Sequence, residues 1–506
     1  MVNLYRPEAR GATARAAQTD LLIGDIFRSA ARSTPSRVAV DLGDRSLTFG
    51  EIDRAANRIG RTMRDLGAAR GEPVAVVGAR NLHLVAVFAA AAKLGAVYSP
   101  IDPHLDADSL LDLLQVARPS LVVLDDETGA SAKELAAELG VTSIGLARLV
   151  RTSAGESDAE LAVTGPGERD PQAQFFVPAG AGRAKAAVVS HRAHFLRTQL
   201  GTLPRTGGPA ICPWSLAELT AWKIALRQWQ ARERVALVDP KDPAALCEAA
   251  GRIKATQLSA SPSILTELVS YAAGTDDSPA RLSSLRRIDI ECAALSGELA
   301  GALGALLPGA KLRVVYSSPE AGDIAGLEQP DFDRKPGSCG LPAPLGELMV
   351  ERTGELCVRG PVLFDGYFED GEATEASVVD GWYHTGDTVE VDRDGFLSIL
   401  GPLREVIRTR NGAVAPIEVE TALEEHFDVA DVAVIGMPDP VLGEVVCAVV
   451  VPVPGRESPS LAELRAFCRD RIEEFKAPSR LAVVDAIPRT PGTRQVMRPL
   501  LHAQLS

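Results

Sequence analysis

Short apolar, β-branched runs alternate with amphipathic, alanine-rich segments through the first three quarters of the chain. Three such runs, each bounded by Gly, Pro or Asp, are PVAVVG (73–78), SLVVLDD (120–126) and VALVDP (235–240), and they predict buried strands. The amphipathic segment EIDRAANRIGRTMRDLG predicts a helix that carries on one face Ile52, Ala55, Ile59 and Met63. Alternation of this kind predicts an α/β fold with parallel sheets and helices on both faces.

The pattern changes twice toward the C-terminus. From about residue 320 to 400 glycine and proline rise, and GELCVRG and GFLSILG predict short strands of a small β-rich subdomain. From Arg404 the pattern predicts a small α+β domain with helices at PIEVETALEEH and SLAELRAFCRDRIEEF and strands at DVAVIGMP, VVCAVVVPV and RLAVVDAIP. The polar segment 151–174 has almost no periodicity, so we expect an exposed loop or linker there.

Composition narrows the function classes. With 506 residues, 46% hydrophobic and 24% charged, the chain is a multidomain globular protein. A net charge of −14 argues against a nucleic-acid partner. The longest apolar stretch, Leu84 to Ala92, is too short to span a bilayer, and MVNLYRPEAR lacks the apolar core of a secretory signal. Seven cysteines without a CxxC pair suit a reducing compartment better than disulfides or a zinc site, so we expect a cytoplasmic protein.

The most informative stretch is GWYHTGDTVEVDRDGFLSILGPLREVIRTRNGAVAPIEVE (381–420). Asp387 closes a Thr-Gly-Asp turn, where a carboxylate can accept hydrogen bonds from two vicinal hydroxyls. An ordinary turn between strands is the alternative interpretation. The turn is followed by Gly401-Pro402-Leu403-Arg404-Glu405 and by Pro416-x-Glu418-x-Glu420, which opens a predicted helix.

With these motifs in place, the sequence resembles the adenylate-forming superfamily of acyl- and aryl-CoA synthetases, nonribosomal peptide synthetase adenylation domains and luciferases. The resemblance covers nearly the whole chain. Further matching elements, in chain order, are SLTFGEIDRAANRIG (46–60), KLGAVYSPIDP (93–103), LSGE (295–298), YSSPE (316–320), GELCVRGPVLFDGY (354–367), LGE (442–444), FKAP (475–478) and IPRTPGTRQVMR (487–498).

The resemblance implies a large N-terminal domain (1–403) of two α/β subdomains and a small β-rich subdomain. It also implies a small, mobile α+β C-terminal domain (404–506). In the implied chemistry a carboxylate attacks the α-phosphate of ATP, and a nucleophile then displaces AMP. Because two anions must meet, the site needs Mg²⁺, a cation and phosphate donors.

Roles for individual residues follow from the resemblance alone. Glu320 would bind Mg²⁺, with a solvated loop carboxylate as the alternative, and Tyr316 would stack on adenine, with a core aromatic as the alternative. Asp387 would bind the ribose hydroxyls, Gly297 would let the backbone approach the base, and Arg404 would act as the hinge. Glu298 and Ser317 are also expected to contact the nucleotide, and Ser296 is expected in the substrate pocket together with Pro213 and Trp214.

The phosphate loop departs from the family pattern, which is rich in Thr and Ser. Here the loop is Phe176-Val177-Pro178-Ala179-Gly180-Ala181-Gly182-Arg183-Ala184-Lys185-Ala186. Gly180 and Gly182 can still form a backbone anion site, and Lys185 keeps a cation there. The hydroxyls that would bind the β- and γ-phosphates are absent, and each lost hydrogen bond to a charged phosphate would cost about 1.5–3 kcal/mol.

Two further departures lie near the C-terminal domain. Arg494 stands where the family has a catalytic lysine, and its planar fork is a poor substitute for a compact point charge. A working cation and a relic remain equally open for Arg494. Pro402 replaces the family arginine before the hinge, and Asn411 replaces a loop glycine.

The substrate pocket is the least legible part. Amino-acid-activating relatives carry an acid near ICPWSLAEL (211–219), and none stands at Pro213-Trp214-Ser215, which argues against a free α-amino acid. Trp214 could form a flat wall for an aromatic or acyl group or be a structural tryptophan. His191 and His194 have no partner pattern and are interpreted as structural or surface histidines.

Three functions remain open. The leading hypothesis is a ligase that activates a carboxylic acid with ATP and transfers it to a thiol or amine, such as coenzyme A or a carrier protein acting in trans. The second is a specialised member that starts from a preformed activated acyl group or uses an unusual acid such as nitrite. The third is an inactive relative that binds a ligand or a partner. Retention of Glu320, Tyr316 and Asp387 speaks against the third.

Overall fold

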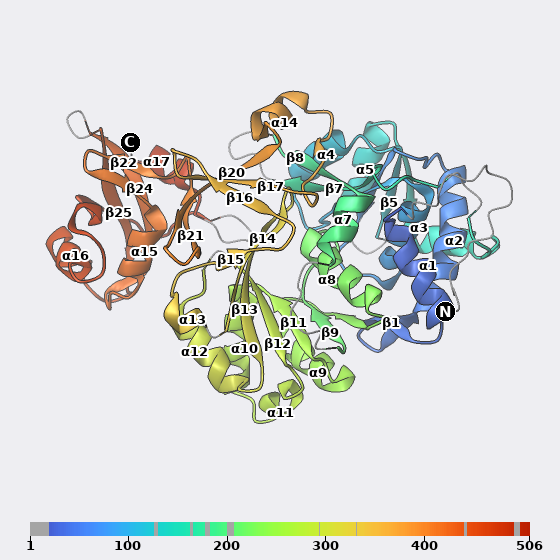
Figure 1. Ribbon diagram of the computed structural model, residues 1–506, viewed down its shortest axis with the longest axis horizontal. Coiled ribbons are helices and arrows are strands. Elements are labelled where there is room, and N and C mark those ends of the chain that lie inside the picture. The colour runs from blue at the N-terminus through green and yellow to red at the C-terminus, as the bar shows by residue number, and fades with distance from the viewer. Residues whose placement is uncertain are drawn as a thin grey trace. The chain divides into compact units, whose positions relative to one another are not determined.

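The computed structural model describes residues 20–125, 130–161, 165–177, 183–199, 207–292, 294–329, 331–439, 443–489 and 496–505. The chain divides into two units (Figure 1). Unit 1 takes its described residues from Met1–Ala260, Ser270–Arg286 and Pro361–Gly371, and unit 2 takes them from Ser261–Val269, Arg287–Gly360 and Glu372–Ser506. The boundary expected between residues 403 and 404 stays a prediction.

The seven-stranded sheet of unit 1 has the order β18-β8-β7-β4-β3-β5-β6. Its strands are β3 (Pro73–Val77), β4 (Val97–Ile101), β5 (Leu121–Leu124), β6 (Thr142–Gly145), β7 (Pro171–Val177), β8 (Lys185–Ser190) and β18 (Gly366–Tyr367). β3 is buried along its whole length between parallel neighbours, as an apolar β-branched run requires. β7 and β8 pair antiparallel, so the sheet is mixed rather than purely parallel.

A second group of strands in unit 1 has the order β11-β9-β10-β1-β2. The pairs β11–β9, β9–β10 and β10–β1 are parallel. Its strands are β1 (Val38–Leu42), β2 (Arg45–Thr48), β9 (Ala210–Cys212), β10 (Val235–Leu237) and β11 (Gln257–Ala260). The helices of unit 1 are α1 (Ile23–Ser33), α2 (Phe49–Asp65), α3 (Leu82–Leu94), α4 (Ala107–Ala117), α5 (Ala130–Glu138), α6 (Leu146–Ser153), α7 (His191–Arg197), α8 (Leu219–Gln230), α9 (Pro243–Ile253) and α11 (Ser278–Leu282). α10 (Pro262–Ala273) runs through the point where unit 2 gives way to unit 1.

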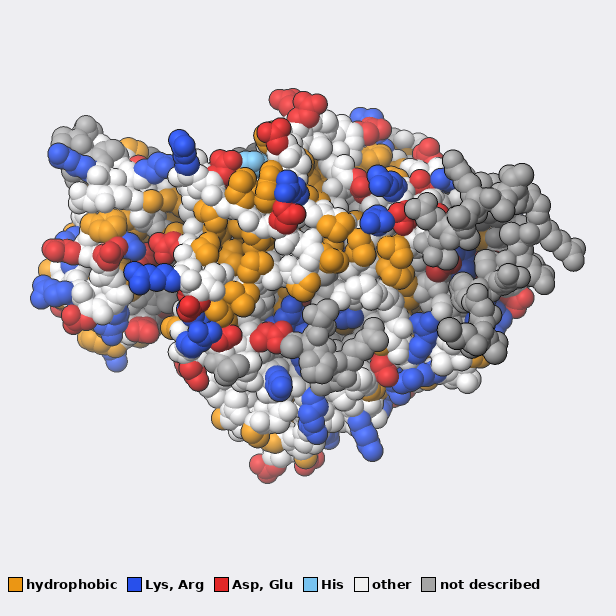
Figure 2. Space-filling model, viewed as in Figure 1, with side chains coloured by type: hydrophobic (Ala, Val, Ile, Leu, Met, Phe, Trp, Pro, Cys, Tyr) orange, Lys and Arg blue, Asp and Glu red, His pale blue; other side chains and the backbone are white. Residues whose placement is uncertain are grey.

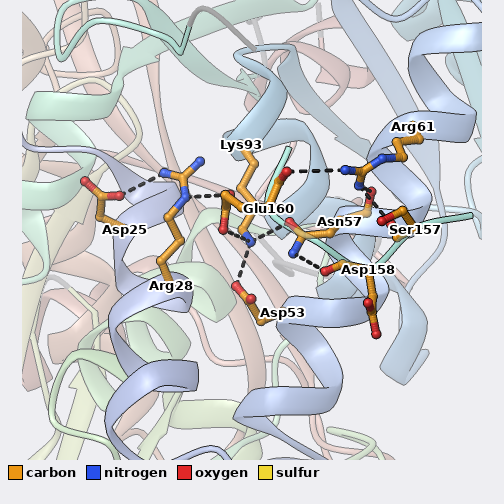
Figure 3. A network of polar contacts seen from close by, with 9 residues as sticks. All are labelled: Asp25, Arg28, Asp53, Asn57, Arg61, Lys93, Ser157, Asp158 and Glu160. Atoms are coloured by element: carbon orange, nitrogen blue, oxygen red, sulfur yellow. Dashed lines mark hydrogen bonds and ion pairs between the residues drawn. The ribbon is translucent and has the colours of Figure 1, made fainter. Parts of the chain in front are cut away.

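A buried lysine ties the first three helices of unit 1 together (Figure 3). Lys93 lies on α3 and is fully buried, and its Nζ lies 2.6 Å from Asp53 Oδ1 and 2.8 Å from Asn57 Oδ1, both on α2. Glu160 Oε2 lies 3.5 Å from the same amine, and its Oε1 accepts from Arg28 of α1 at 2.8 Å. The lysine charge is therefore neutralised from α2 and from the segment that follows α6.

Unit 2 contains three groups of strands. The first has the order β15-β14-β13-β12, with β12 (Arg287–Glu291), β13 (Lys311–Ser318), β14 (Gly322–Glu328) and β15 (Leu341–Pro342). The second is the small antiparallel sheet β16-β17-β20-β19 with β21 on β20, comprising β16 (Glu347–Val350), β17 (Glu355–Arg359), β19 (Val378–Val379), β20 (Trp382–Val391) and β21 (Leu397–Pro402). This sheet is the predicted β-rich subdomain.

The third group is the sheet β23-β22-β25-β24 with β26 on β25. Its strands are β22 (Ile407–Thr409), β23 (Gly412–Val414), β24 (Val429–Asp439), β25 (Gly443–Pro452) and β26 (Arg480–Val483). The helices of unit 2 are α12 (Gly297–Leu306), α13 (Asp331–Arg334), α14 (Gly371–Ser377), α15 (Pro416–Glu424), α16 (Leu461–Cys468), the 3₁₀ turn Glu474–Lys476 and α17 (Arg498–Leu505). The first residue of α14, Gly371, is the last residue of unit 1. Apolar faces of α15 and α16 pack on this sheet, which confirms the predicted α+β arrangement.

Two local predictions were wrong. The segment 151–174 is not an exposed loop throughout, because α6 ends within it and β7 begins within it, and Gln172 and Gln174 of β7 are fully buried with hydrogen-bond partners. The helix predicted from SLAELRAFCRDRIEEF ends at Cys468, where the amides of residues 471 and 472 both donate to the Cys468 carbonyl. On α2 the predicted face is present, with Ile52, Ile59 and Met63 buried and Ala55 partly buried.

Three further features concern the charged surface, the helices and the cysteines. On the face drawn in Figure 2, acidic and basic side chains are interspersed. Among the described residues, no helix is both long and apolar enough to cross a membrane. All seven cysteines are free thiols.

Replacing Lys93 by methionine should lower the free energy of unfolding, because Asp53 then keeps its position without a cation. Removing one partner of a buried ion pair costs about 3–5 kcal/mol, and the 17% exposure of the Asp53 side chain favours the lower end. Urea unfolding of the full chain measures the loss. The control is Arg58→Met, whose pair with Asp158 is exposed and should cost less than about 1 kcal/mol. Equal losses for the two variants would contradict the assignment.

Candidate functional site

The Thr-Gly-Asp turn lies within β20 and is anchored on both sides. Gly386 has φ of +74°, a left-handed conformation that glycine adopts without steric cost. Its amide donates to Glu355 Oε1 at 2.9 Å, and its carbonyl accepts from the Leu403 amide at 2.6 Å. The Asp387 amide donates to Thr385 Oγ1 at 3.1 Å. These contacts fix the direction in which the Asp387 carboxylate leaves the strand.

Asp387 and Tyr316, two of the predicted nucleotide residues, lie in contact. The Tyr316 hydroxyl donates to Asp387 Oδ2, which joins β13 to β20. Burial raises the pKa of the Asp387 carboxyl above its usual value, although the hydrogen bond from Tyr316 opposes this shift. Burial and the adjacent carboxylate raise the pKa of Tyr316 well above its usual value. The phenol therefore stays protonated and acts as the donor.

Glu320 lies in the turn between β13 and β14 and is only 6% exposed. In the same region Ser317 Oγ donates to Glu291 Oε2 at 3.2 Å. Mg²⁺ prefers carboxylate and other oxygen ligands, so the chemistry of the Glu320 side chain suits a magnesium ion. Glu291 lies at the end of β12 and was not among the residues predicted from the sequence.

The LSGE segment opens α12. Ser296 is the N-cap residue, and its hydroxyl accepts from the Leu299 amide at 3.3 Å. Gly297 and Glu298 form the exposed first turn. A side chain at Gly297 would meet no atom of the protein within 4 Å, so packing within the protein does not require glycine there. That space suits the close backbone approach expected for a base.

The described end of the phosphate loop belongs to unit 1, and its two cations are engaged by protein groups. Arg183 pairs with Asp112 of α4 at 2.5 Å and donates to Gln115 at 2.5 Å. Lys185 Nζ lies 4.8 Å from the centre of the Tyr367 ring, a cation–π geometry. Gly180 and Gly182 lie outside the described residues.

The predicted hinge lies between two anchored neighbours. Arg404 is exposed in the turn after β21, Leu403 is bound to the Thr-Gly-Asp turn, and Glu405 accepts from Arg498 at 2.7 Å. Arg498 also donates to Glu420 of α15 at 2.6 Å. Arg494 lies outside the described residues.

A groove of about 510 Å³ lies in the C-terminal part of unit 2. It is lined by the segment around Asn411, by Glu444 of the LGE motif and by Phe475 and Ala477 of the FKAP motif. The Glu444 carboxylate accepts from the Arg408 amide at 2.7 Å. Elements far apart in the sequence thus form one surface here.

Of the predicted substrate residues, Pro213 and Trp214 are in unit 1 and Ser296 is in unit 2. Pro213 is buried and Trp214 is half-buried after β9. Trp214 Nε1 donates to the Ser259 carbonyl at 2.8 Å, which fixes the plane of the indole ring. A fixed, half-buried ring is compatible both with a pocket wall and with a structural role, so the role of Trp214 stays a prediction.

His191 and His194 are both fully buried on α7. His191 Nδ1 accepts from the Ile23 amide at 3.2 Å, and His194 Nδ1 donates to Gln172 Oε1 at 2.6 Å. Burial lowers the pKa of His191 to about 4 and that of His194 to about 3. Both are therefore neutral at physiological pH, which agrees with the structural interpretation.

A family model described as "AMP-binding enzyme" matches residues 27–368, and one described as "AMP-binding enzyme C-terminal domain" matches residues 418–493. The chain belongs to the AMP-binding enzyme family. The adenylate-forming resemblance and the α/β fold class are thereby confirmed, and this AMP-binding enzyme is an ATP-dependent ligase.

Among relatives, a fatty acid–[acyl-carrier-protein] ligase, ScoC of Streptomyces coeruleorubidus, is 28% identical over 93% of this chain and 94% of its own. A feruloyl-CoA synthase from an Amycolatopsis species is 28% identical over 92% of this chain and 96% of its own. The crystal structure of ATP-bound MatB from Rhodopseudomonas palustris superimposes with a TM-score of 0.83 at 24% identity, covering 95% of this chain and 98% of that one. The last comparison supports the fold.

The neutral histidines predict how the stability of this AMP-binding enzyme depends on pH. Below pH 6.5 the unfolded chain protonates these rings, whereas the folded chain does so only near pH 4 for His191 and pH 3 for His194. The free energy of unfolding should therefore fall as pH drops from 6.5 to about 4, by about 1.4 kcal/mol per pH unit for each ring.

Urea unfolding at a series of pH values measures this slope. His194→Gln keeps a hydrogen-bond donor toward Gln172 and should reduce the slope by one ring's share. An unchanged slope in His194→Gln would contradict the assignment.

Proposed function

We propose that this enzyme activates a carboxylic acid, aromatic or fatty, as an acyl-adenylate and transfers the acyl group to the thiol of coenzyme A or of a carrier protein. In the first step a carboxylate oxygen bonds to the α-phosphorus of ATP, and pyrophosphate leaves with the bridging oxygen. In the second step the thiol loses its proton, its sulfur bonds to the acyl carbon, and AMP leaves. The names of the relatives, a fatty acid ligase and a feruloyl-CoA synthase, support this range of acids and acceptors.

The contact between Tyr316 and Asp387 carries the proposal. A carboxylate that is anchored through its turn and bonded by one phenol has a fixed direction, as recognition of two vicinal ribose hydroxyls requires. The Tyr316 ring, joined to this carboxylate through its hydroxyl, would stack on adenine. Gly297 and Glu298 at the start of α12 add backbone amides at a helix N-terminus, which favours anionic groups.

Glu320 would hold a magnesium ion, which supplies charge neutralisation for the phosphates. Ser317 and Glu291 position oxygen atoms in the same region. Arg494 would supply the cation between carboxylate and α-phosphate. Lys185, together with the amides of Gly180 and Gly182, would contact the β- and γ-phosphates once the amine leaves the Tyr367 ring.

The groove beside Phe475 and Glu444 would take the acceptor. Its volume of about 510 Å³ is sufficient for an extended thiol-bearing arm rather than for a whole nucleotide-bearing cofactor. Pro213, Trp214 and Ser296 are proposed for the acid. A fixed indole ring would favour flat or apolar acyl groups over charged amino acids.

Asp387→Ala should weaken nucleotide binding at least tenfold, because hydrogen bonds to a charged group contribute about 1.5–3 kcal/mol. Calorimetric titration of the full chain with Mg-ATP, and separately with AMP, measures the affinity. Tyr316→Phe should cause a smaller loss, since the ring remains. The control is Asp394→Ala, an exposed carboxylate in the turn between β20 and β21, which should leave the affinity unchanged.

The titration also separates the alternatives. Binding of both nucleotides supports adenylation from ATP. Binding of AMP alone favours chemistry that begins with a preformed activated acyl group, which the altered phosphate loop and the engagement of Arg183 and Lys185 would explain. Binding of neither would contradict the proposal.

Arg494→Lys tests the replaced lysine. If Arg494 occupies the catalytic position as a poor substitute, the compact ammonium should raise the rate of pyrophosphate release with a panel of acids by about tenfold. The control Arg469→Lys makes the same exchange at an exposed position after α16. A lower rate in Arg494→Lys would show that the guanidinium itself is required.

A further inference from the structure

A thiol, an imidazole and two carboxylates converge at one point of the small antiparallel sheet in unit 2. Cys357 on β17 stands directly opposite His384 on β20 in the strand ladder. Glu351 lies just before the turn that leads into β17, and Glu355 is the first residue of β17. The ligand atoms of Glu351, Cys357 and His384 all lie within 4.8 Å of one another.

We propose that Cys357, His384 and Glu351, with Glu355 at the fourth position, form a binding site for a borderline-soft divalent metal ion such as Zn²⁺. This inference does not rest on the proposed function, and the site is separate from the magnesium position proposed at Glu320. The donor set is the first argument, because thiolate and imidazole select zinc-like ions over Mg²⁺.

The spacing is the second argument. Cys357 Sγ lies 3.5 Å from His384 Nδ1. Two tetrahedral zinc ligands with bonds of about 2.3 Å to sulfur and 2.0–2.1 Å to nitrogen lie about 3.6 Å apart. Glu355 Oε2 lies 3.1 Å from the same imidazole nitrogen, near the corresponding spacing of nitrogen and oxygen ligands. These two spacings correspond to two of the six edges of a ligand tetrahedron.

The rigidity of the ligands is the third argument. Cys357 is fully buried and His384 partly buried, and the register of β17 and β20 holds them opposite one another. Glu355 is held by the Gly386 amide on its other oxygen. Glu351 is exposed, so a rotamer change can bring its carboxylate to the ion. A site on strands needs little reorganisation on binding.

Without a metal ion, Cys357 Sγ and Glu355 Oε2 compete for the same ring nitrogen of His384. His384 Nδ1 faces both Cys357 Sγ and Glu355 Oε2, and one ring nitrogen cannot donate a proton to one neighbour and accept from the other at the same time. A thiol must give up its proton to bind a metal ion. Binding would release the thiol proton and any proton on Nδ1 to solvent, and three negative charges would then face one divalent ion.

Co²⁺ titration of the full chain, reduced and freed of metal, tests the site without nucleotide. We expect one equivalent of Co²⁺ to bind with a thiolate-to-cobalt charge-transfer band and a tetrahedral visible spectrum. Zn²⁺ should remove both signals, whereas Mg²⁺ should not. Cys357→Ser should abolish the charge-transfer band and weaken Zn²⁺ binding at least tenfold. The control Cys468→Ser changes another fully buried thiol, on α16, and should keep the band.

A second variant keeps the test decisive if Cys357→Ser does not fold. Glu351→Gln changes an exposed side chain, so the melting temperature of the metal-free protein should not change, while Zn²⁺ affinity should fall at least tenfold. A charge-transfer band that survives in Cys357→Ser, or a Zn²⁺ affinity that is unchanged in Glu351→Gln, would overturn the proposal. Because no nucleotide takes part, either result is independent of whether ATP binds.

Discussion

The candidate site depends on the two contacts that the Glu355 carboxylate makes. One oxygen accepts from the Gly386 amide, and the other lies 3.1 Å from the His384 ring. The first contact stabilises the left-handed turn and so directs Asp387 toward Tyr316. The second places the imidazole opposite Cys357. A single side chain at the start of β17 thus organises both the proposed ribose contact and the proposed metal site.

Unit 1 holds several polar groups deep in the protein. Lys93 is neutralised by Asp53 and Glu160, and Gln172 and Gln174 of β7 bond to His194 and Ser99. Buried polar networks of this kind are costly to leave incomplete. They fix the relative positions of helices and strands more narrowly than apolar packing alone would.

Most of the fold was predictable from the sequence, because hydrophobic periodicity marks buried strands such as β3 and β5 and because many ordered motifs match one family. β7 was missed in part, since its buried glutamines look like loop residues until their partners are known. In the site, Asp387 and Tyr316 were predictable through the resemblance, but their contact was not. Cys357 and His384 stand 27 residues apart, and only the strand register brings them together, so no spacing motif could have indicated a metal site.

The anchoring around Arg404 constrains how the C-terminal part can move. Leu403 is bound to the Thr-Gly-Asp turn, and Glu405 is bound through Arg498 to α15. A rotation of the small domain of the kind that the family resemblance implies would turn the backbone at Arg404. The Glu405 amide donates to the Pro402 carbonyl at 2.8 Å across that residue, so a change of orientation would begin with the opening of this turn.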